Sequence, residues 1–170
     1  MRRHSARGFT LVEIMIVVAI IALLAAIAIP NVLRGRTTAN ESVSIGNLRA
    51  LMSSLEMYRS VNNVYPNATS GAWQADMYTN ATPDYGPPAF NVAMTGQTVS
   101  SYNYTFTGVS GGTTYTLDTV PSTPLTTGTR RFRADETGLI RHCTCADTTC
   151  AAPASWSAEA TVDATATSCG

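Results

Sequence analysis

The sequence contains no lysine and only two histidines, His4 and His142, so it offers few side chains that could act as general bases or activate a nucleophile. It has no glycine-rich phosphate-binding loop, no haem-attachment motif and no pair of carboxylates placed for acid–base chemistry. Asp135 and Glu136 are adjacent, but they stand in the turn-like stretch D-E-T-G. These absences argue against an enzyme and give no reason to expect a cofactor or a small-molecule substrate.

Charge is also scarce, because charged residues make up only 13% of the chain. Eleven arginines balance eleven acidic residues, and the formal net charge is zero. Nucleic-acid-binding domains are typically strongly basic, so nucleic acid is not an expected partner. Beyond residue 62 the chain is rich in Thr, Ser, Ala, Asn and Gly, a composition that suits exposed strands and loops outside the cytoplasm.

One long apolar run, from Phe9 to Ile29, stands out against this polar background. Its 21 residues would form a helix of about 31 Å, close to the roughly 30 Å of a bilayer's hydrocarbon core. The run contains one charge, Glu13, and a carboxylate in hydrocarbon costs on the order of 2.5–3.5 kcal/mol. An ordinary secretory signal has a shorter apolar region of roughly 7–15 residues, and a plain membrane anchor leaves Glu13 unexplained.

The junction R-G-F-T-L-V-E and the apolar run after it resemble the prepilin signal of the type IV pilin superfamily, which includes the type II secretion pseudopilins. The resemblance is detailed from Arg7 to about Pro66 and thin beyond. It implies that a prepilin peptidase removes residues 1–8 by cutting after Gly8 on the cytoplasmic side, and that Phe9 is then N-methylated. It also implies that residues 9–30 first span the bacterial inner membrane and later form the core of a helical filament.

Glu13 and Pro30 have roles in this family that we expect here. The family's assembly scheme pairs the glutamate with the N-terminal amine of a neighbouring subunit, here that of Phe9. Opposite charges attract strongly in a low-dielectric setting, and each offsets the desolvation of the other; the alternative is a carboxylate that snorkels to the membrane interface. Pro30 lacks a backbone donor and clashes with the carbonyl of Ala26, so it predicts a kink in the helix. A bend without an assembly role stays open.

Residues 31–62 are predicted to continue the same helix as an amphipathic segment, giving one helix of about 54 residues. Asn47 and Ser54 are placed on its polar face. Tyr65-Pro66 follows the helix, and proline stops any continuation. The apolar stripe consists of residues at three- and four-residue spacing: Ile45, Leu48, Met52, Leu55 and Tyr58, widened by Val43 and Leu51.

The stretch 63–99 shows no sustained periodicity and contains several prolines and glycines, so we expect a long surface loop with a short helix near Trp73–Tyr78. Alternating apolar and polar residues in 100–142 predict a small antiparallel sheet of about four strands, arranged as two hairpins. The long helix packed on this sheet makes an α+β fold. The residues expected to face the helix are Tyr102, Tyr104, Phe106, Tyr115, Leu117, Phe132 and Ala134.

All four cysteines, Cys143, Cys145, Cys150 and Cys169, lie in the tail 143–170. An even number in this place is consistent with disulfides formed in an oxidising compartment. Cys143 and Cys145 are too close in sequence to bond to each other readily, which leaves Cys143–Cys150 with Cys145–Cys169, or Cys143–Cys169 with Cys145–Cys150. A zinc site is the alternative, but the spacing C-x-C-x4-C-x18-C suits zinc poorly, so no metal is expected.

From these features we expect a structural subunit of a type IV pilus, with residues 31–170 as a globular domain that is periplasmic before assembly and extracellular afterwards. The resemblance implies three kinds of partner: other copies of the chain, the prepilin peptidase, and an inner-membrane assembly platform with its ATPase. The alternatives are a pseudopilin of a type II secretion system, a minor pilin, or a membrane-anchored binding module that never polymerises. An acidic calcium-binding loop would favour a major pseudopilin, and the C-terminal sequence contains no such cluster.

Overall fold

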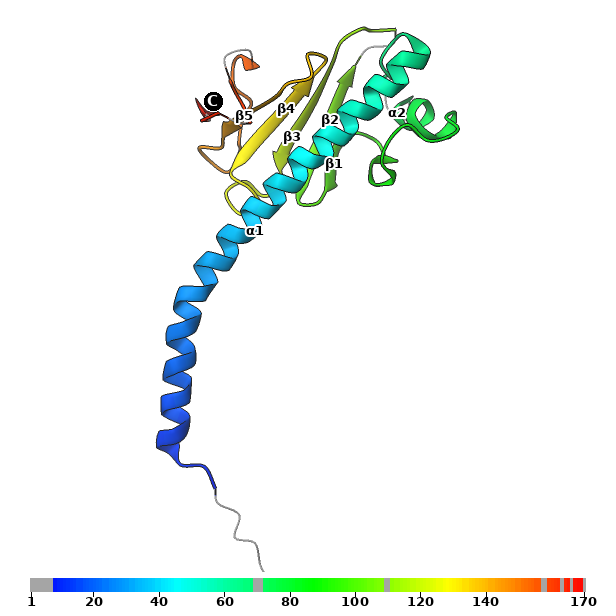
Figure 1. The fold of residues 1–170 in the computed structure, drawn as a ribbon. Helices are drawn as coiled ribbons and strands as arrows, with labels where there is room; N and C mark the ends of the chain where they lie inside the picture. Colours follow the sequence, from blue (N-terminus) through cyan, green and yellow to red (C-terminus); the bar gives the residue numbers. More distant parts are fainter. Residues whose placement is uncertain are drawn as a thin grey trace, which may run out of the picture. The chain divides into compact units, whose positions relative to one another are not determined.

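A computed structural model describes residues 8–68, 72–108, 111–156, 159–162, 164–165 and 167–169. Residues 1–7, which make up most of the expected leader, lie outside the described residues. The chain divides into two compact units, Met1–Arg36 and Thr37–Gly170. Figure 1 shows the elements of each unit in the colours of the sequence.

A single helix, α1 (Leu11–Asn62), confirms the predicted long N-terminal helix with its apolar and amphipathic parts. It ends where Asn63 adopts a left-handed backbone conformation (φ 60°) and donates its N–H to the carbonyl of Arg59 at 2.8 Å. A left-handed residue directly after the last helical turn is a common way to terminate a helix, and asparagine tolerates it well.

The helix face that packs in the second unit differs in detail from the predicted stripe. Leu48, Leu51, Leu55 and Tyr58 are buried as expected, but Val43 is 45% exposed. Ser54, expected on the polar face, is buried instead, and its hydroxyl donates to the carbonyl of Ala50 at 2.9 Å. A serine that bonds to its own helix can lie against the core at little cost.

The sheet lies in the second unit, and the C-terminal part of α1 crosses one of its faces (Figure 1). Its first six strands follow sequence order and pair antiparallel, while the seventh pairs parallel with β5. The strands are β1 (Thr95–Val99), β2 (Tyr102–Gly108), β3 (Tyr115–Pro121), β4 (Arg130–Asp135), β5 (Ile140–Thr144), β6 (Ala160–Thr161) and β7 (Thr167–Ser168).

The α+β fold and the two hairpins, β2–β3 and β4–β5, are confirmed, but the expected number of about four strands is wrong. The described residues form seven strands. The additional strand β1 reads T-G-Q-T-V and has no apolar alternation, because it is an exposed edge strand. The other two, β6 and β7, have two residues each and belong to the cysteine-containing tail, too short for any periodicity to appear.

The core lies between α1 and the inner face of the sheet, and the predicted inward-facing residues of β2, β3 and β4 are buried there. The expectation of a surface loop over 63–99 is wrong for part of that stretch. Its short helical turns, α2 (Ala72–Gln74), η1 (Ala75–Thr79) and η2 (Pro88–Phe90), confirm the expected short helix. They also bring Trp73 and Phe90 into the core, where the indole N–H of Trp73 donates to the carbonyl of Phe90 at 3.0 Å.

Candidate functional site

The first unit consists of an apolar helix whose side chains have no cover. Phe9 is 87% exposed and Leu11 74%, and the large apolar side chains from Val12 to Ile29 are 50–66% exposed. Among the described residues, α1 is long and apolar enough to cross a bilayer by length and composition. A helix that exposes apolar side chains all round is stable only in lipid or against other apolar helices. This surface therefore requires a second component.

The start of α1 is a capping box built from Thr10 and Glu13. The hydroxyl of Thr10 accepts the backbone N–H of Glu13 at 3.2 Å, while the carboxylate of Glu13 accepts the backbone N–H of Thr10 at 2.7 Å and its hydroxyl at 2.8 Å. Each side chain thus binds a backbone donor that the first helical turn leaves unpaired. The pattern T-L-V-E before an apolar run is a sequence-level capping signal, so this role of Thr10 could have been predicted but was missed.

The expected cleavage point, between Gly8 and Phe9, lies in non-helical backbone just before the capping box. Both residues are exposed, and a Cβ added to Gly8 would meet no other atom within 4 Å. A peptidase needs an accessible substrate, and Gly8 and Phe9 meet that requirement. Cleavage after Gly8 stays a prediction.

Pro30 lies inside α1, whose helical backbone continues on both sides of it. The proline removes the donor that would bond to the carbonyl of Ala26. In the next residue, Asn31, the side-chain amide donates to the carbonyl of Ile27 at 3.1 Å and adds a bond to this weakened turn. The kink at Pro30 stays a prediction.

In the second unit, a buried carboxylate attaches α1 to the start of β4. Glu41 is 6% exposed and accepts the backbone N–H and the hydroxyl of Thr129, each at 2.8 Å, and the Nε–H of Arg130 at 2.8 Å. The preceding residue, Asn40, donates its side-chain amide N–H to the carbonyl of Thr127 at 2.8 Å. We call these contacts the Glu41 clamp. They connect residues nearly 90 positions apart, and nothing local in the sequence indicates them.

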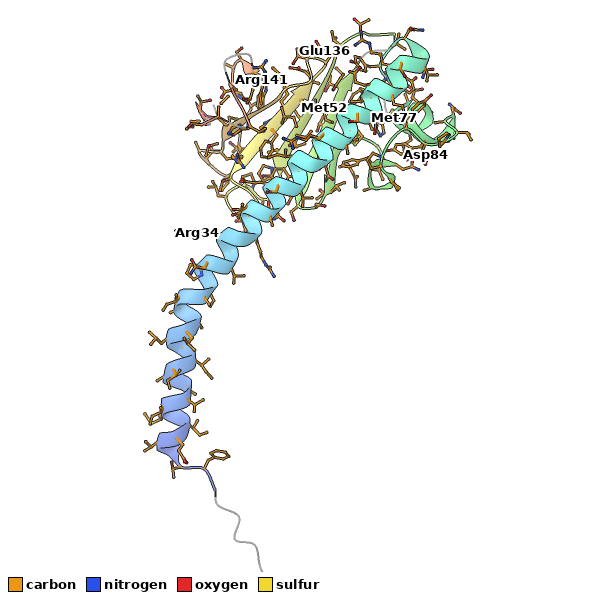
Figure 2. The ribbon with its side chains drawn as sticks, viewed as in Figure 1. Arg34, Met52, Met77, Asp84, Glu136 and Arg141 are labelled. Atoms are coloured by element: carbon orange, nitrogen blue, oxygen red, sulfur yellow. A yellow bond between two sulfur atoms is a disulfide. The ribbon has the colours of Figure 1, made fainter. Side chains whose placement is uncertain are left out.

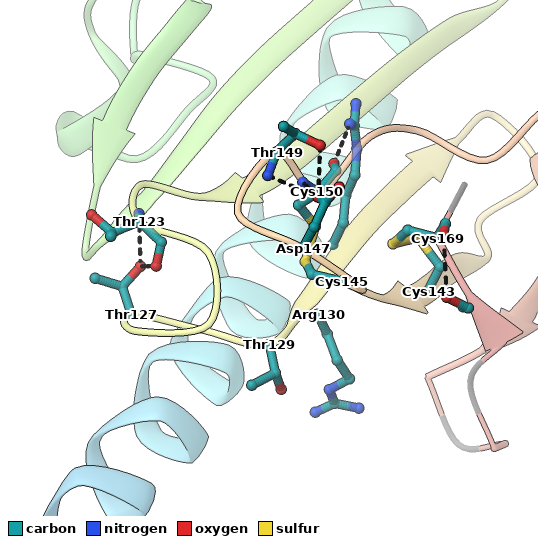
Figure 3. The surroundings of a disulfide bond; sticks show 12 residues. Thr123, Thr127, Thr129, Arg130, Cys143, Cys145, Asp147, Thr149, Cys150 and Cys169 are labelled. Atoms are coloured by element: carbon teal, nitrogen blue, oxygen red, sulfur yellow. Dashed lines mark hydrogen bonds between the residues drawn. A yellow bond between two sulfur atoms is a disulfide. The ribbon is translucent and has the colours of Figure 1, made fainter.

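The tail is closed by two disulfides, Cys143–Cys169 and Cys145–Cys150, which is one of the two pairings that the sequence left open (Figure 3). The sulfur atoms of three of these cysteines lie within 4.8 Å of one another, but every cysteine is in a disulfide. A disulfide sulfur is no thiolate, so this cluster does not fit a metal ion.

The same tail covers the outer face of the sheet and forms a second, smaller core with Trp156. Arg133 lies under the indole of Trp156, 5.1 Å from the ring centroid, and binds Asp118 on β3 with two nitrogen atoms. Arg131 donates to the carbonyl of Cys150 at 3.0 Å. These outward-facing arginines are therefore occupied within the chain and form no free basic patch.

Comparison with known proteins finds a family motif at the N-terminus and relatives that match part of the chain. Residues 3–29 match the family described as the prokaryotic N-terminal methylation motif. A type II secretion system core protein G of Klebsiella michiganensis is 41% identical over 71 residues, which are 42% of this chain and 50% of that protein. The type IV wide pilus major component PilA4 of Thermus thermophilus is 48% identical over 62 residues, 36% of this chain and 47% of that protein.

A core protein G of Pseudomonas aeruginosa is 39% identical over 71 residues, again 42% of this chain and 50% of the relative. The chain thus spans about half the length of the curated relatives it matches. No solved structure matches it significantly. By its methylation motif and these relatives, the chain is similar over part of its length to type IV pilins and type II secretion pseudopilins.

Proposed function

We propose that this chain is a structural subunit of a type IV pilus. In this proposal, a prepilin peptidase cuts after Gly8, Phe9 becomes the methylated N-terminus, and the apolar helix passes from the inner membrane into the core of an extracellular filament. The chain has no catalytic step of its own, and an assembly platform with its ATPase supplies the work. The observation that carries the proposal is the uncovered apolar helix that bears Glu13 within a methylation motif.

Burial of that helix against copies of itself would drive assembly. Each large apolar side chain gains about 1.5–3 kcal/mol on full burial in place of water, although lipid already supplies much of this in the membrane. A polar contact must therefore select the correct neighbour. Cleavage leaves an ammonium group on Phe9, and a neighbour's Glu13 is the carboxylate available to it within the apolar run. The loss of residues 1–8 also removes three arginines and no acid, which leaves a net charge of −3.

The test separates the charge of Glu13 from its capping role. Glu13→Gln keeps an oxygen for the backbone N–H of Thr10 but cannot neutralise an amine, whereas Glu13→Ala loses both functions. If the pairing is correct, both variants insert into the membrane but yield few filaments that can be sheared from cells. Asp84→Asn, a change at an exposed acid of the second unit, is the control and should leave the yield unchanged. Normal filaments from Glu13→Gln would refute the pairing.

Cleavage needs its own measurement. Gly8→Ala should leave an uncleaved precursor in the membrane, because the resemblance assigns the cut to the bond after this glycine. Mass spectrometry of the filament subunit should find Phe9 as the first residue, one added methyl group and a mass deficit of four hydrogens from two disulfides. A mature subunit that still begins with Met1 would overturn the proposal.

A second candidate, a type II secretion pseudopilin, is favoured by the relatives named core protein G. Both candidates use the same N-terminal segment, so the variants above do not separate them. The location of the filament separates the two candidates, because a pilus subunit is recovered in filaments sheared from the cell surface. A subunit that stays with the cell envelope, and whose deletion stops protein export, would favour the pseudopilin.

A further inference from the structure

The connection between β3 and β4, residues 122–129, presents a leucine outward on a firmly bonded loop. Leu125 is 47% exposed and has a left-handed backbone (φ 66°), a conformation in which the Cβ of leucine crowds the next carbonyl. Its N–H donates to the carbonyl of Gly128 at 2.8 Å, and Thr127 bonds to Thr123 through backbone and hydroxyl (Figure 3). Strained residues held in this way often mark functional surfaces.

The Glu41 clamp holds this loop against α1. Thr127 accepts the amide of Asn40, and Thr129 donates twice to Glu41. Leu125 is therefore presented on a loop whose C-terminal half is bonded to α1, and little loop entropy is lost when a partner covers it. Within residues 122–129 no side chain is charged, and Ser122, Thr123 and Thr126 expose hydroxyl groups.

A matching hollow lies between α1 and the turn that joins β4 to β5. Its volume is about 160 Å³, and its lining consists of Arg49, Met52, Gly138, Leu139, Ile140, Thr161 and Val162. Met52 is labelled on α1 in Figure 2. Apolar cavities of about 150 Å³ accommodate benzene, so the hollow has room for the four-carbon side chain of a leucine. Leu139 on its rim is 43% exposed, which leaves more apolar surface to be covered.

Arg49 on the rim of the hollow can donate hydrogen bonds to the uncharged loop 122–129. It is exposed, and no ion pair in the described part of the chain includes it. Its guanidinium has donors for the hydroxyl and carbonyl oxygens of an uncharged loop, and such a loop offers no positive charge to repel it.

Leu125 cannot reach the hollow of its own chain. The loop is bonded to α1 at Asn40 and Glu41, whereas the hollow begins at Arg49 and Met52, which is on the order of 12–18 Å further along the helix at 1.5 Å per residue. A projecting apolar group and a hollow elsewhere on the same molecule produce a head-to-tail contact, and such contacts propagate into open filaments unless the rotation closes a ring.

We propose that Leu125 of one copy occupies the hollow between α1 and β5 of a neighbouring copy in the filament. This inference rests on the proposed function, because it needs the helices to bring the copies together. One leucine covers far less than the 1,200–2,000 Å² of a stable interface, so the contact forms no dimer on its own. Between copies already tethered by their helices, covering half a leucine favours the correct neighbour by about five- to tenfold.

The first test uses charge. Leu125→Arg places a cation opposite Arg49 and should lower the yield of sheared filaments at least tenfold, while Leu125→Glu should lower it less. Arg49→Glu combined with Leu125→Arg should restore the yield. Val61→Arg, at a 64% exposed position on the last turns of α1, is the matched control and should leave the yield unchanged. Unchanged filaments from Leu125→Arg, or no recovery in the double variant, would overturn the inference.

The second test maps the contact directly. A benzophenone amino acid at position 125 should cross-link, in isolated filaments, to peptides containing Met52 or Leu139 of another copy. Cross-links to lipid, to a different protein or to another surface of the pilin would overturn the inference while leaving the proposed function intact. If the unmodified chain yields no filaments at all, the proposed function fails, and this inference fails with it.

Discussion

Removal of the Glu41 carboxylate is the sharpest test of how the second unit is held together. Glu41→Ala leaves three donors without their acceptor: the backbone N–H and hydroxyl of Thr129 and the Nε–H of Arg130. The removal of one partner from a buried ion pair costs about 3–5 kcal/mol, but the side chain of Arg130 is 28% exposed and can partly rehydrate. With that discount, we expect a loss of about 2–3 kcal/mol in the free energy of unfolding.

For a unit of this size, such a loss lowers the melting temperature by roughly 6–10 °C. The measurement is thermal unfolding of the full chain in detergent, followed by near-ultraviolet circular dichroism. That signal reports on the second unit, because Trp73 and Trp156 are both buried there. Glu41→Gln keeps an oxygen for Thr129 but loses the charge, so about half the effect is expected. Asp84→Ala, at an exposed acid, should change little. A shift below about 2 °C for Glu41→Ala would refute the reasoning.

Three further predictions concern the sheet and its tail. Replacing Cys143 and Cys169 by serine opens a loop with a sequence separation of 26 and should lower the free energy of unfolding by about 3.5 kcal/mol. Denaturant unfolding measures this loss, and a midpoint equal to that of the unmodified chain would contradict the prediction. Gly128→Ala should lower the free energy of unfolding by about 1–3 kcal/mol, since the added Cβ would overlap the hydroxyl of buried Tyr102; calorimetry that finds no loss of stability would refute the contact. Burial, with Arg130 nearby, lowers the pKa of His142, so the unfolded chain binds the proton more readily. Stability should therefore fall as the pH drops below about 6.5, and His142→Gln should abolish that part of the pH profile.

The long helix and the two hairpins could be predicted from the sequence because their signals are local. Helical spacing places Leu48 and Leu55 on one face of the helix. Alternation of apolar and polar residues places Tyr104 and Phe132 on one face of the sheet, and all four side chains are buried. A residue's own neighbours determine such patterns, so tertiary contacts confirm them and do not create them.

The buried polar groups could not be predicted, because their partners are distant in sequence. Ser44 is fully buried, and it bonds to Thr119, 75 positions away, and to the hydroxyl of Tyr104. From the sequence alone, a serine or glutamate on a helix is predicted to be exposed to solvent. Nothing local indicates that β1 is a strand or that Trp73 is a core residue, since both depend on the residues that pack beside them. The capping box differs from these polar contacts: it could have been predicted, because its signal is contained in four consecutive residues.

The capping box also bears on how the proposed contact of Glu13 with a neighbour would form. In the single chain, the carboxylate of Glu13 has two donors, both from Thr10, and both bind its Oε2 atom. A carboxylate has two oxygens that accept hydrogen bonds, so these bonds do not occupy Oε1, to which a neighbour's amine could bind. Thr10 also holds the carboxylate in one orientation before a neighbour arrives, and less side-chain entropy is then lost when the two charges meet. In the proposed filament, this threonine would thus prepare the acid for its partner.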